Sequence, residues 1–302
     1  VAVSAQAAEI TMSGAANIYM TNGSKTGKTT FSNDDHITFS GTSELDNGYE
    51  VTFSMQLDGD EADNGVIDNN SVTVNTNGMG TFTWAGHGGS SAMSMMDDKT
   101  PNAYEESWDI IDTDGTTASG SPLVIGGGGG DGMFIYNSPD MGGAVLTVAY
   151  QNHASAAAES YTDFAIAFTG MEGMTLGAAI SNNTVGASND SDETTMYATY
   201  AMGAVTVGIQ GSDEDRTTTG TDQESIAYGI TYAVNDDFSV GYSYHELETE
   251  STTDEDQEST GISASYTMGG MTLAGASNEV NNLAGTATRD VEGYEFTLSF
   301  AF

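Results

Sequence analysis

The sequence predicts an all-β fold: a transmembrane antiparallel up-and-down β-barrel of sixteen strands, with a long third loop folded into the lumen. Two observations support this prediction. Polar and apolar residues alternate within short segments, so each segment has one polar and one apolar face, as a strand between water and lipid requires. Short turns and long polar connections also alternate along the chain, which is the pattern of an up-and-down barrel.

The last segment, residues 291–302, shows the alternation most clearly. The positions on its aromatic face are Tyr294, Phe296, Leu298, Phe300 and Phe302. The positions between them are Glu295, Thr297, Ser299 and Ala301. A strand has a period of two and places all five large side chains on one face. A soluble sheet would have to bury that face, whereas a membrane barrel turns it toward lipid.

Composition limits the class of protein. The chain has 302 residues, 38 Gly, 3 Pro, no Cys and a formal net charge of −39. No run approaches the roughly 18 apolar residues of a membrane-spanning helix. The lack of Cys excludes disulfides, thiolate metal sites and Cys nucleophiles. Nucleic acid is excluded as a partner because the only Lys and Arg residues are Lys25, Lys28, Lys99, Arg216 and Arg289.

Residues 1–8 resemble the end of a secretory signal peptide. Ala5-Gln6-Ala7 fits the A-x-A pattern of a cleavage site. The alternative is an N-terminal tail of small residues. We expect export, and we expect residues 9–302 to form a single barrel domain.

The first clear hairpin joins residues 36–45 to residues 49–57. Asp46-Asn47-Gly48 between them is a tight-turn signal. The polar positions of the second strand are Glu50, Thr52, Ser54 and Gln56. A face that is so uniformly polar is expected to meet water.

Seven short turns and eight long connections follow one another, which gives the sixteen strands. The short turns lie at 46–48, 77–80, 139–143, 170–173, 201–203, 234–237 and 268–270. The long connections are 22–34, 58–70, 88–132, 153–160, 182–193, 212–224, 246–258 and 279–291. Turns at one end and long loops at the other are typical of outer-membrane barrels.

Aromatic residues gather at both ends of the expected strands. Those beside short turns or the chain end are Tyr49, Phe168, Tyr200, Tyr232, Phe238, Tyr266 and Phe302. Those near long loops are Tyr150, Tyr161, Tyr244 and Tyr294. We interpret the two groups as interfacial girdles. The general preference of strands for aromatic residues would not concentrate them at strand ends.

Two other all-β classes compete with this reading. A solenoid repeat is disfavoured because every unit carries a long acidic loop, and the alternation marks one dry and one wet face. A surface adhesin or autotransporter-like β protein would lack the girdles and the terminal aromatic strand, and it would dissolve without detergent.

Taken together, the sixteen alternating strands, the A-x-A leader, the long third loop and the terminal Phe302 resemble the general diffusion porins of Gram-negative bacteria, most closely the alphaproteobacterial type. The resemblance covers residues 9–302. It implies a homotrimer in the outer membrane, in contact with lipid and lipopolysaccharide, with a channel in each subunit. It also implies that loop 88–132 narrows the channel and that the barrel-assembly machinery reads the last strand.

The third loop, 88–132, is predicted to form the pore constriction. Thr100-Pro101 is typical of a helix start. Its apolar side would be Tyr104, Trp108 and Ile111, which follow at helical spacing and would anchor the helix on the barrel wall. The carboxylates expected to face the lumen are Glu105, Glu106, Asp109, Asp112 and Asp114. The alternative is an acidic external lid with incidental spacing.

The expected lumen wall carries acidic residues and no basic ones. Its carboxylates are Glu44, Glu50, Asp163 and Glu295, and all five Lys and Arg residues fall in predicted loops. General porins commonly set basic residues opposite the acidic loop, so the sequence departs from the family here. We therefore expect a uniformly negative lumen, which favours cations. The function predicted is a passive channel for small hydrophilic solutes, with a substrate-specific outer-membrane channel as the alternative.

No cofactor is predicted, apart from a structural calcium ion as an alternative to a solvated acidic surface. Asp112 and Asp114 are its candidate ligands, although neither they nor residues 58–68 match the full calcium-loop spacing. An enzyme is not expected. The histidines His36, His87, His153 and His245 show no zinc spacing, and no G-x-S-x-G motif is present.

Overall fold

The structure is a computed structural model of the whole chain, and it describes most of it. The described residues are 9–23, 28–58, 67–108, 129–152, 160–183, 190–217, 222–250 and 255–302. The proposed signal-peptide remnant at residues 1–8 lies outside them. No described helix is long and apolar enough to cross a membrane.

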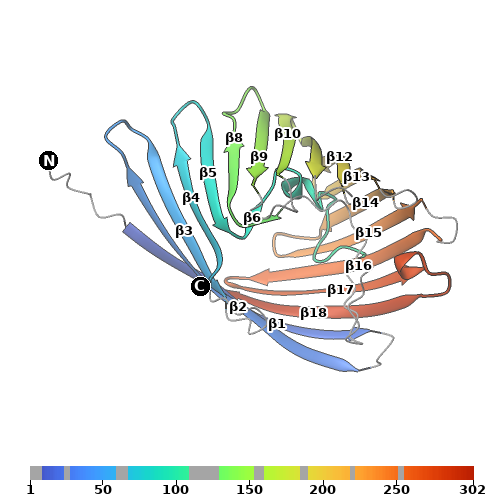
Figure 1. Cartoon of the computed structure of the whole chain (residues 1–302). Helices are drawn as coiled ribbons and strands as arrows, with labels where there is room; N and C mark the ends of the chain where they lie inside the picture. Colours follow the sequence, from blue (N-terminus) through green and yellow to red (C-terminus); the bar gives the residue numbers. More distant parts are fainter. Residues whose placement is uncertain are drawn as a thin grey trace.

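Sixteen strands form one closed antiparallel barrel, as predicted (Figure 1). Each strand pairs with its neighbours in sequence, except that β5 pairs with β8 across the third loop, and β18 returns to pair with β1. The barrel strands are β1 (Glu9–Gly23), β2 (Thr29–Glu44), β3 (Glu50–Asp58), β4 (Ile67–Asn75), β5 (Thr81–His87), β8 (Met133–Asn137), β9 (Ala144–Gln151), β10 (Tyr161–Met171), β11 (Met174–Asn183), β12 (Ser191–Met202), β13 (Val205–Arg216), β14 (Gln223–Ala233), β15 (Phe238–Thr249), β16 (Gln257–Met268), β17 (Met271–Asn281) and β18 (Val291–Ala301).

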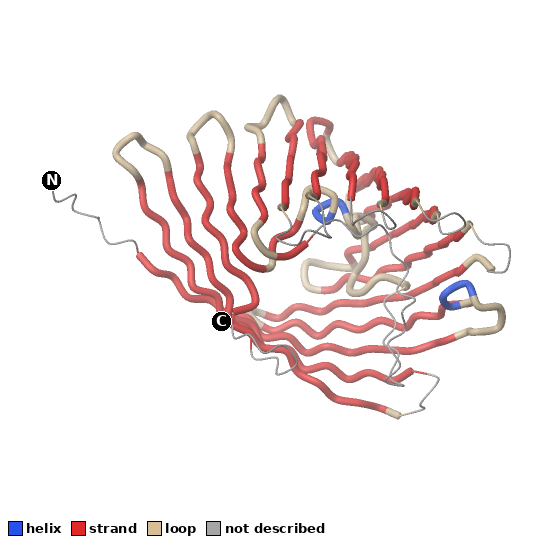
Figure 2. Tube along the Cα trace, in the orientation of Figure 1, coloured by secondary structure: helices blue, strands red, loops and turns tan. Residues whose placement is uncertain are grey.

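The elements outside the barrel are small. A two-stranded sheet of β6 (Gly89–Ser90) and β7 (Gly129–Gly130) joins the two stems of the third loop. A 3-10 helix, η1 (Ser94–Met96), follows β6, and another, η2 (Leu283–Gly285), lies between β17 and β18. Figure 2 shows part of the third loop inside the ring of strands.

The two faces of each strand differ as the alternation predicted. On β18, Phe296 is 46% exposed on the outer face, while the next residue, Thr297, is 4% exposed on the inner face. On β16, two strands away, the outer-face residue Ile262 is 61% exposed. Large apolar side chains on the outside and small or polar ones inside reverse the arrangement of a soluble protein and suit a barrel surrounded by lipid.

Several strands extend into segments predicted as loops. β2 begins at Thr29, inside predicted loop 22–34, and β13 runs to Arg216, inside predicted loop 212–224. The prediction that all five Lys and Arg residues lie in loops is therefore wrong for Arg216. The physical reason is that polar residues on both faces also suit a strand end that projects beyond the membrane, where both faces meet water.

Tyr161 also lies elsewhere than predicted. It was assigned to an interfacial girdle, but its side chain points inward and is 1% exposed. The rings of Tyr200, Tyr232 and Tyr266 do lie on the outer face, where each is more than 40% exposed. Its position next to connection 153–160 therefore did not show which face Tyr161 occupies. The side chain lies on the inner face, where the third loop packs against it at Ser91.

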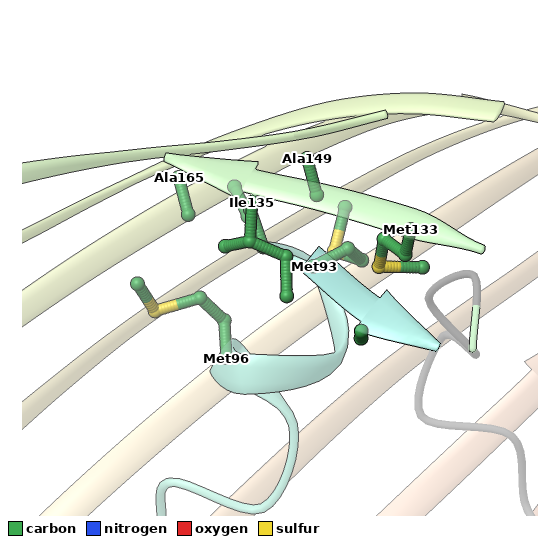
Figure 3. Close-up of a cluster of buried hydrophobic side chains, with 9 residues drawn as sticks. Met93, Met96, Met133, Ile135, Ala149 and Ala165 are labelled. Atoms are coloured by element: carbon green, nitrogen blue, oxygen red, sulfur yellow. The ribbon is translucent and has the colours of Figure 1, made fainter. Parts of the chain in front are cut away.

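The main apolar cluster lies inside the barrel, where the loop meets the wall (Figure 3). Met93 and Met96 of the loop pack there against side chains of the inner wall, four of which are alanine. The wall residues in the cluster are Ala85, Met133, Ile135, Ala149, Ala165 and Ala179. The wall is lined with alanine at this point because larger side chains would leave no room for the loop.

Candidate functional site: a loop fixed along the inner wall

The start of the third loop is held by a buried polar contact. The Met93 amide donates a hydrogen bond to Asp163 Oδ2 (2.5 Å), and the hydroxyl of Tyr161 donates to the same oxygen (3.2 Å). Ser91 Oγ lies 3.3 Å from that hydroxyl. Asp163 was predicted as a carboxylate of the lumen wall. It does lie on the inner wall, but it is 0% exposed beneath the loop, so it holds the loop in place and does not line open water.

A second attachment follows on β13. Gln210 accepts a hydrogen bond from the Lys99 amide through Oε1 (2.8 Å) and donates through Nε2 to the Met96 carbonyl (2.7 Å). Its Nε2 also donates to Thr195 Oγ1 on β12 (3.0 Å). One buried amide side chain thus satisfies two backbone groups of the loop, which fixes the loop after η1.

From Pro101 to Ser107 the loop runs across the inner wall of β13 to β17. The Ala103 amide donates to Ser263 Oγ on β16 (3.2 Å), and Asn278 Nδ2 on β17 donates to the Glu106 carbonyl (2.6 Å). The helix predicted from Thr100-Pro101 is absent from residues 101–108. Backbone groups that a helix would pair internally are paired here with the wall, and the tertiary contact overrides the local helix signal.

Tyr104 brings the loop to β18. Its hydroxyl hydrogen-bonds both Glu295 and Thr297 on the inner face of that strand. Burial and the Glu295 carboxylate raise the pKa of Tyr104, so the phenol stays protonated. Tyr104 was predicted to anchor the loop on the wall, and it does make a wall contact there, through its hydroxyl.

Acidic groups from loop and wall gather near this contact. The carboxylates of Asp34 on β2, Glu295 on β18 and Glu105 on the loop all act electrostatically on the phenol of Tyr19 on β1. Asn17 Nδ2 donates to Asp34 Oδ2 (3.4 Å). We name Tyr19, Asp34, Tyr104, Glu105 and Glu295 the acidic eyelet. The structure thus brings together two of the predicted pore carboxylates, Glu105 and Glu295, and adds Asp34, which the sequence analysis missed.

A second acidic group lies further back along the loop. Asn102 Nδ2 donates to Glu106 Oε1 (3.2 Å), and Glu106 acts electrostatically on Asp97. Burial, and then the neighbouring charge of Asp98, raise the pKa of Asp97 to about 7. Asp97 can therefore change its charge near neutral pH, which few carboxyl groups do.

Trp108 meets the wall at β15. Its ring lies 4.5 Å from that of His245, centroid to centroid, with an interplanar angle of 48°. His245 faces inward and is 0% exposed. Trp108 was predicted as a wall anchor, and it makes that contact.

The other predicted site residues lie apart from this group or outside the described residues. Glu44 and Glu50 are directly opposite each other on β2 and β3, beside the turn at 45–49, and both are exposed. Asp109, Ile111, Asp112 and Asp114 lie outside the described residues, so the calcium prediction there stays a prediction. Among the described residues, no group of three or more His, Asp or Glu side chains is arranged to hold a metal ion.

Basic groups are few along the described channel. Arg216 Nη2 donates to Glu214 Oε2 on the same strand (2.7 Å). Lys99 lies on the loop beside Asp97. The six strands β1 to β5 and β18 contain no Lys or Arg. The described walls around the acidic eyelet therefore carry carboxylates without a facing row of cations.

Sequence reasoning missed the wall residues that hold the loop, chiefly Gln210, Ser263 and Asn278. Their only signal is a polar side chain at an inward strand position, and dozens of lumen-facing residues share it. Nothing local distinguishes a polar group that bonds the loop from one that bonds water.

A family model described as Gram-negative porin matches residues 1–282. No curated protein sequence matches the chain.

Solved structures share the fold along nearly the whole chain. An anion-selective porin from Comamonas acidovorans aligns with a TM-score of 0.74 at 16% identity, covering 98% of this chain and 100% of that one. A loop-deletion mutant of OmpT, an outer membrane protein of Vibrio cholerae, aligns with a TM-score of 0.72 at 13% identity, covering 98% and 100%. A mutant of the Rh. blastica porin aligns with a TM-score of 0.70 at 17% identity, covering 97% and 100%.

Proposed function

The chain belongs to the Gram-negative porin family, and from this we propose that it is a passive channel for small hydrophilic solutes that prefers cations. It is an outer-membrane protein, and its family and barrel fold are those of passive channels. The acidic eyelet carries the proposed ion preference. Three of its members, Asp34, Glu105 and Glu295, are carboxylates, and they come from three different elements around one point of the lumen.

The preference follows from electrostatics in a narrow channel. A lumen with low-dielectric walls and one sign of charge concentrates counter-ions and repels co-ions. A transverse field would need basic side chains facing the loop, and β1 to β5 and β18 supply none. The porin from Comamonas acidovorans is described as anion-selective. At 16% identity that likeness extends to the fold alone, so the ion preference here is argued from this chain's own residues.

The reversal potential of the purified protein in a planar bilayer tests the proposal. Under a KCl gradient we expect a potential of cation-selective sign that shrinks as salt rises, because the Debye length falls from about 10 Å at 0.1 M to about 3 Å at 1 M. An anion-selective sign at low salt would refute the preference while leaving the channel function intact. Absence of conductance would refute the channel.

A homotrimer, contact with lipopolysaccharide, and recognition of β18 by the barrel-assembly machinery are part of the same proposal. Support for the trimer comes from membership of the porin family. The mass of the detergent-solubilised protein, corrected for bound detergent, measures the number of copies. A mass of one chain, 31.3 kDa, would refute the trimer.

A further inference from the structure

Four glycines lie at inward positions of four successive strands, directly beneath the third loop. Gly208 on β13 and Gly229 on β14 are paired across the ladder, and Gly241 on β15 and Gly261 on β16 continue the series. We name these four residues the glycine track. Glycine in the interior of a strand weakens it and often marks a close approach of another backbone.

At each of these positions a side chain would collide with the loop. A Cβ on Gly229 would lie 2.5 Å from the Pro101 carbonyl oxygen and 2.9 Å from its nitrogen. A Cβ on Gly208 would lie 2.4 Å from Pro101 Cδ. On Gly241 it would lie 2.9 Å from the Ala103 amide nitrogen and 2.8 Å from Ser263 Oγ of the wall. On Gly261 it would lie 3.0 Å from Ser107 Cα and 2.4 Å from Asn278 Oδ1 of the wall. The loop from Pro101 to Ser107 therefore lies in contact with the wall backbone.

Other strand glycines of the same barrel are covered differently. A Cβ on Gly177 would meet the ring of Tyr197, and one on Gly275 would meet the ring of Phe296, as well as the Glu295 carbonyl oxygen. Gly211, which faces outward on the same strand as Gly208, would meet nothing closer than the Ser225 carbonyl oxygen at 3.9 Å. At Gly208 and Gly229 the nearest atoms belong to Pro101 of the loop. At Gly241 and Gly261 the loop backbone shares the space with Ser263 and Asn278, the two wall side chains that bond the loop. The loop backbone cannot rotate away as a side chain does.

We propose that the glycine track determines where the loop lies across the barrel and therefore how wide the channel is. This inference rests on the proposed channel function. The hydrogen bonds that Ser263 accepts from the Ala103 amide and that Asn278 donates to the Glu106 carbonyl hold the loop on the track, and the missing side chains set its depth. A side chain on the track displaces the loop away from β13–β16, which is toward the lumen. The bore is thus specified by residues that no solute touches.

Single-channel conductance of Gly229→Leu and Gly241→Leu tests the inference, with Gly211→Leu as the matched outward control. We expect the single-channel conductance of each track variant to fall about two-fold. The loop must shift toward the lumen by the width of a side chain, and this shift narrows the channel. Gly211→Leu should conduct like the unmodified protein. Unmodified conductance in both track variants would overturn the proposal.

A second measurement does not depend on conduction and uses the absence of cysteine in the chain. Ala103→Cys with Ser263→Cys places two thiols where the Ala103 amide now reaches Ser263 Oγ at 3.2 Å. That contact keeps the two Cα atoms within about 7 Å, the range in which a disulfide forms. We expect the pair to oxidise in air in the folded barrel and to fail to oxidise when Gly229→Leu is added, a variant whose new side chain meets only Pro101 of the loop.

The outcomes of the two experiments separate the two proposals. A protein that does not conduct but forms the disulfide only when Gly229 is unchanged refutes the channel and supports the track. A protein that conducts and forms the disulfide equally with and without Gly229→Leu refutes the track and leaves the channel standing. Failure of the pair to oxidise in an otherwise unmodified barrel also refutes the track.

Discussion

The inner wall of β13–β16 differs from the inner wall of β1–β3, although both are built from alternating strands. On β13–β16 the inner residues are buried and many are small, such as Ser243 at 2% and Ser259 at 0% exposed. On β1–β3 they are longer, polar and half-exposed, such as Asp34, Thr38 and Gln56. The loop covers the first stretch, and water meets the second. We call the inner wall of β13–β16 the covered wall and that of β1–β3 the open wall. Side-chain volume and hydrogen bonds to the loop determine which residues suit the covered wall, and charge determines which residues suit the open wall.

If the two walls differ in this way, substitutions that remove an attachment of the third loop have the largest effect, which is on how often the loop opens. Asp163→Ala removes the acceptor of the Met93 amide. Leaving that buried amide unpaired costs about 2 kcal/mol, which raises local opening of the loop about 30-fold. The rate at which a protease cuts within residues 88–108 of the folded barrel measures the opening.

Two controls sharpen that result. Asp163→Asn keeps an acceptor oxygen in place and should restore most of the protection. Glu44→Ala, on the open wall beside a short turn, should leave the cutting rate unchanged. Equal cutting in Asp163→Ala and the unmodified protein would show that the loop is held without this contact.

The contact of Trp108 with His245 is expected to contribute less. Trp108→Ala removes ring packing worth about 1 kcal/mol beyond its buried area. We expect about a five-fold rise in protease cutting of the loop, with the reversal potential unchanged. Trp108→Phe retains a ring, so its rate of protease cutting should lie between those of Trp108→Ala and the unmodified protein. A change in ion selectivity larger than the change in protease cutting would place Trp108 in the ion path. It would contradict the assignment of Trp108 to the wall that holds the loop.

The covered wall is also where sequence reasoning stopped. Alternation placed Phe296 outside and Thr297 inside correctly, because the period of a strand is a local property that each segment carries alone. The path of the loop is not local, since Lys99 and Gln210 are 111 residues apart when they bond. Gly229 and Gly261 likewise carry no local signal that a segment more than 100 residues away lies against them. The helix predicted after Thr100 failed for the same reason, because its backbone partners lie on distant strands.

On the open wall, charge is expected to matter more than size. A unit charge about 6 Å from a passing ion changes its energy by about 0.7 kcal/mol in water, or about three-fold in local concentration. We therefore expect Asp34→Asn and Glu105→Gln each to lower the cation preference by up to about three-fold, less at high salt. The reversal potential in a KCl gradient measures both.

Glu44→Gln is the control for these two substitutions. It removes the same charge at the short-turn mouth, away from the acidic eyelet, and should change selectivity least. If Glu44→Gln changed selectivity as much as Asp34→Asn, the ion preference would belong to the mouth and the eyelet would lose its role.

The smallest expected effect is a pH dependence from Asp97, which lies on the loop between the two groups that bond Gln210, the Met96 carbonyl and the Lys99 amide. Burial raises its pKa to about 7, above the ordinary value of 3.8, so the docked loop favours the protonated form. Loop docking is then strongest below about pH 4 and weakens as pH rises through 7, because the charge must form in a buried place.

The cation preference of the channel changes in the opposite sense and rises with pH, because Asp97 gains its negative charge. Lowering pH from 8 to 6 removes this charge, and cation preference should fall by less than two-fold, since one charge among several changes. Asp97→Asn should show the low preference at both pH values. Asp98→Asn should keep a step but move it to lower pH, because it removes a charge that raises the pKa of Asp97. A step that survives in Asp97→Asn would assign the titration to another group.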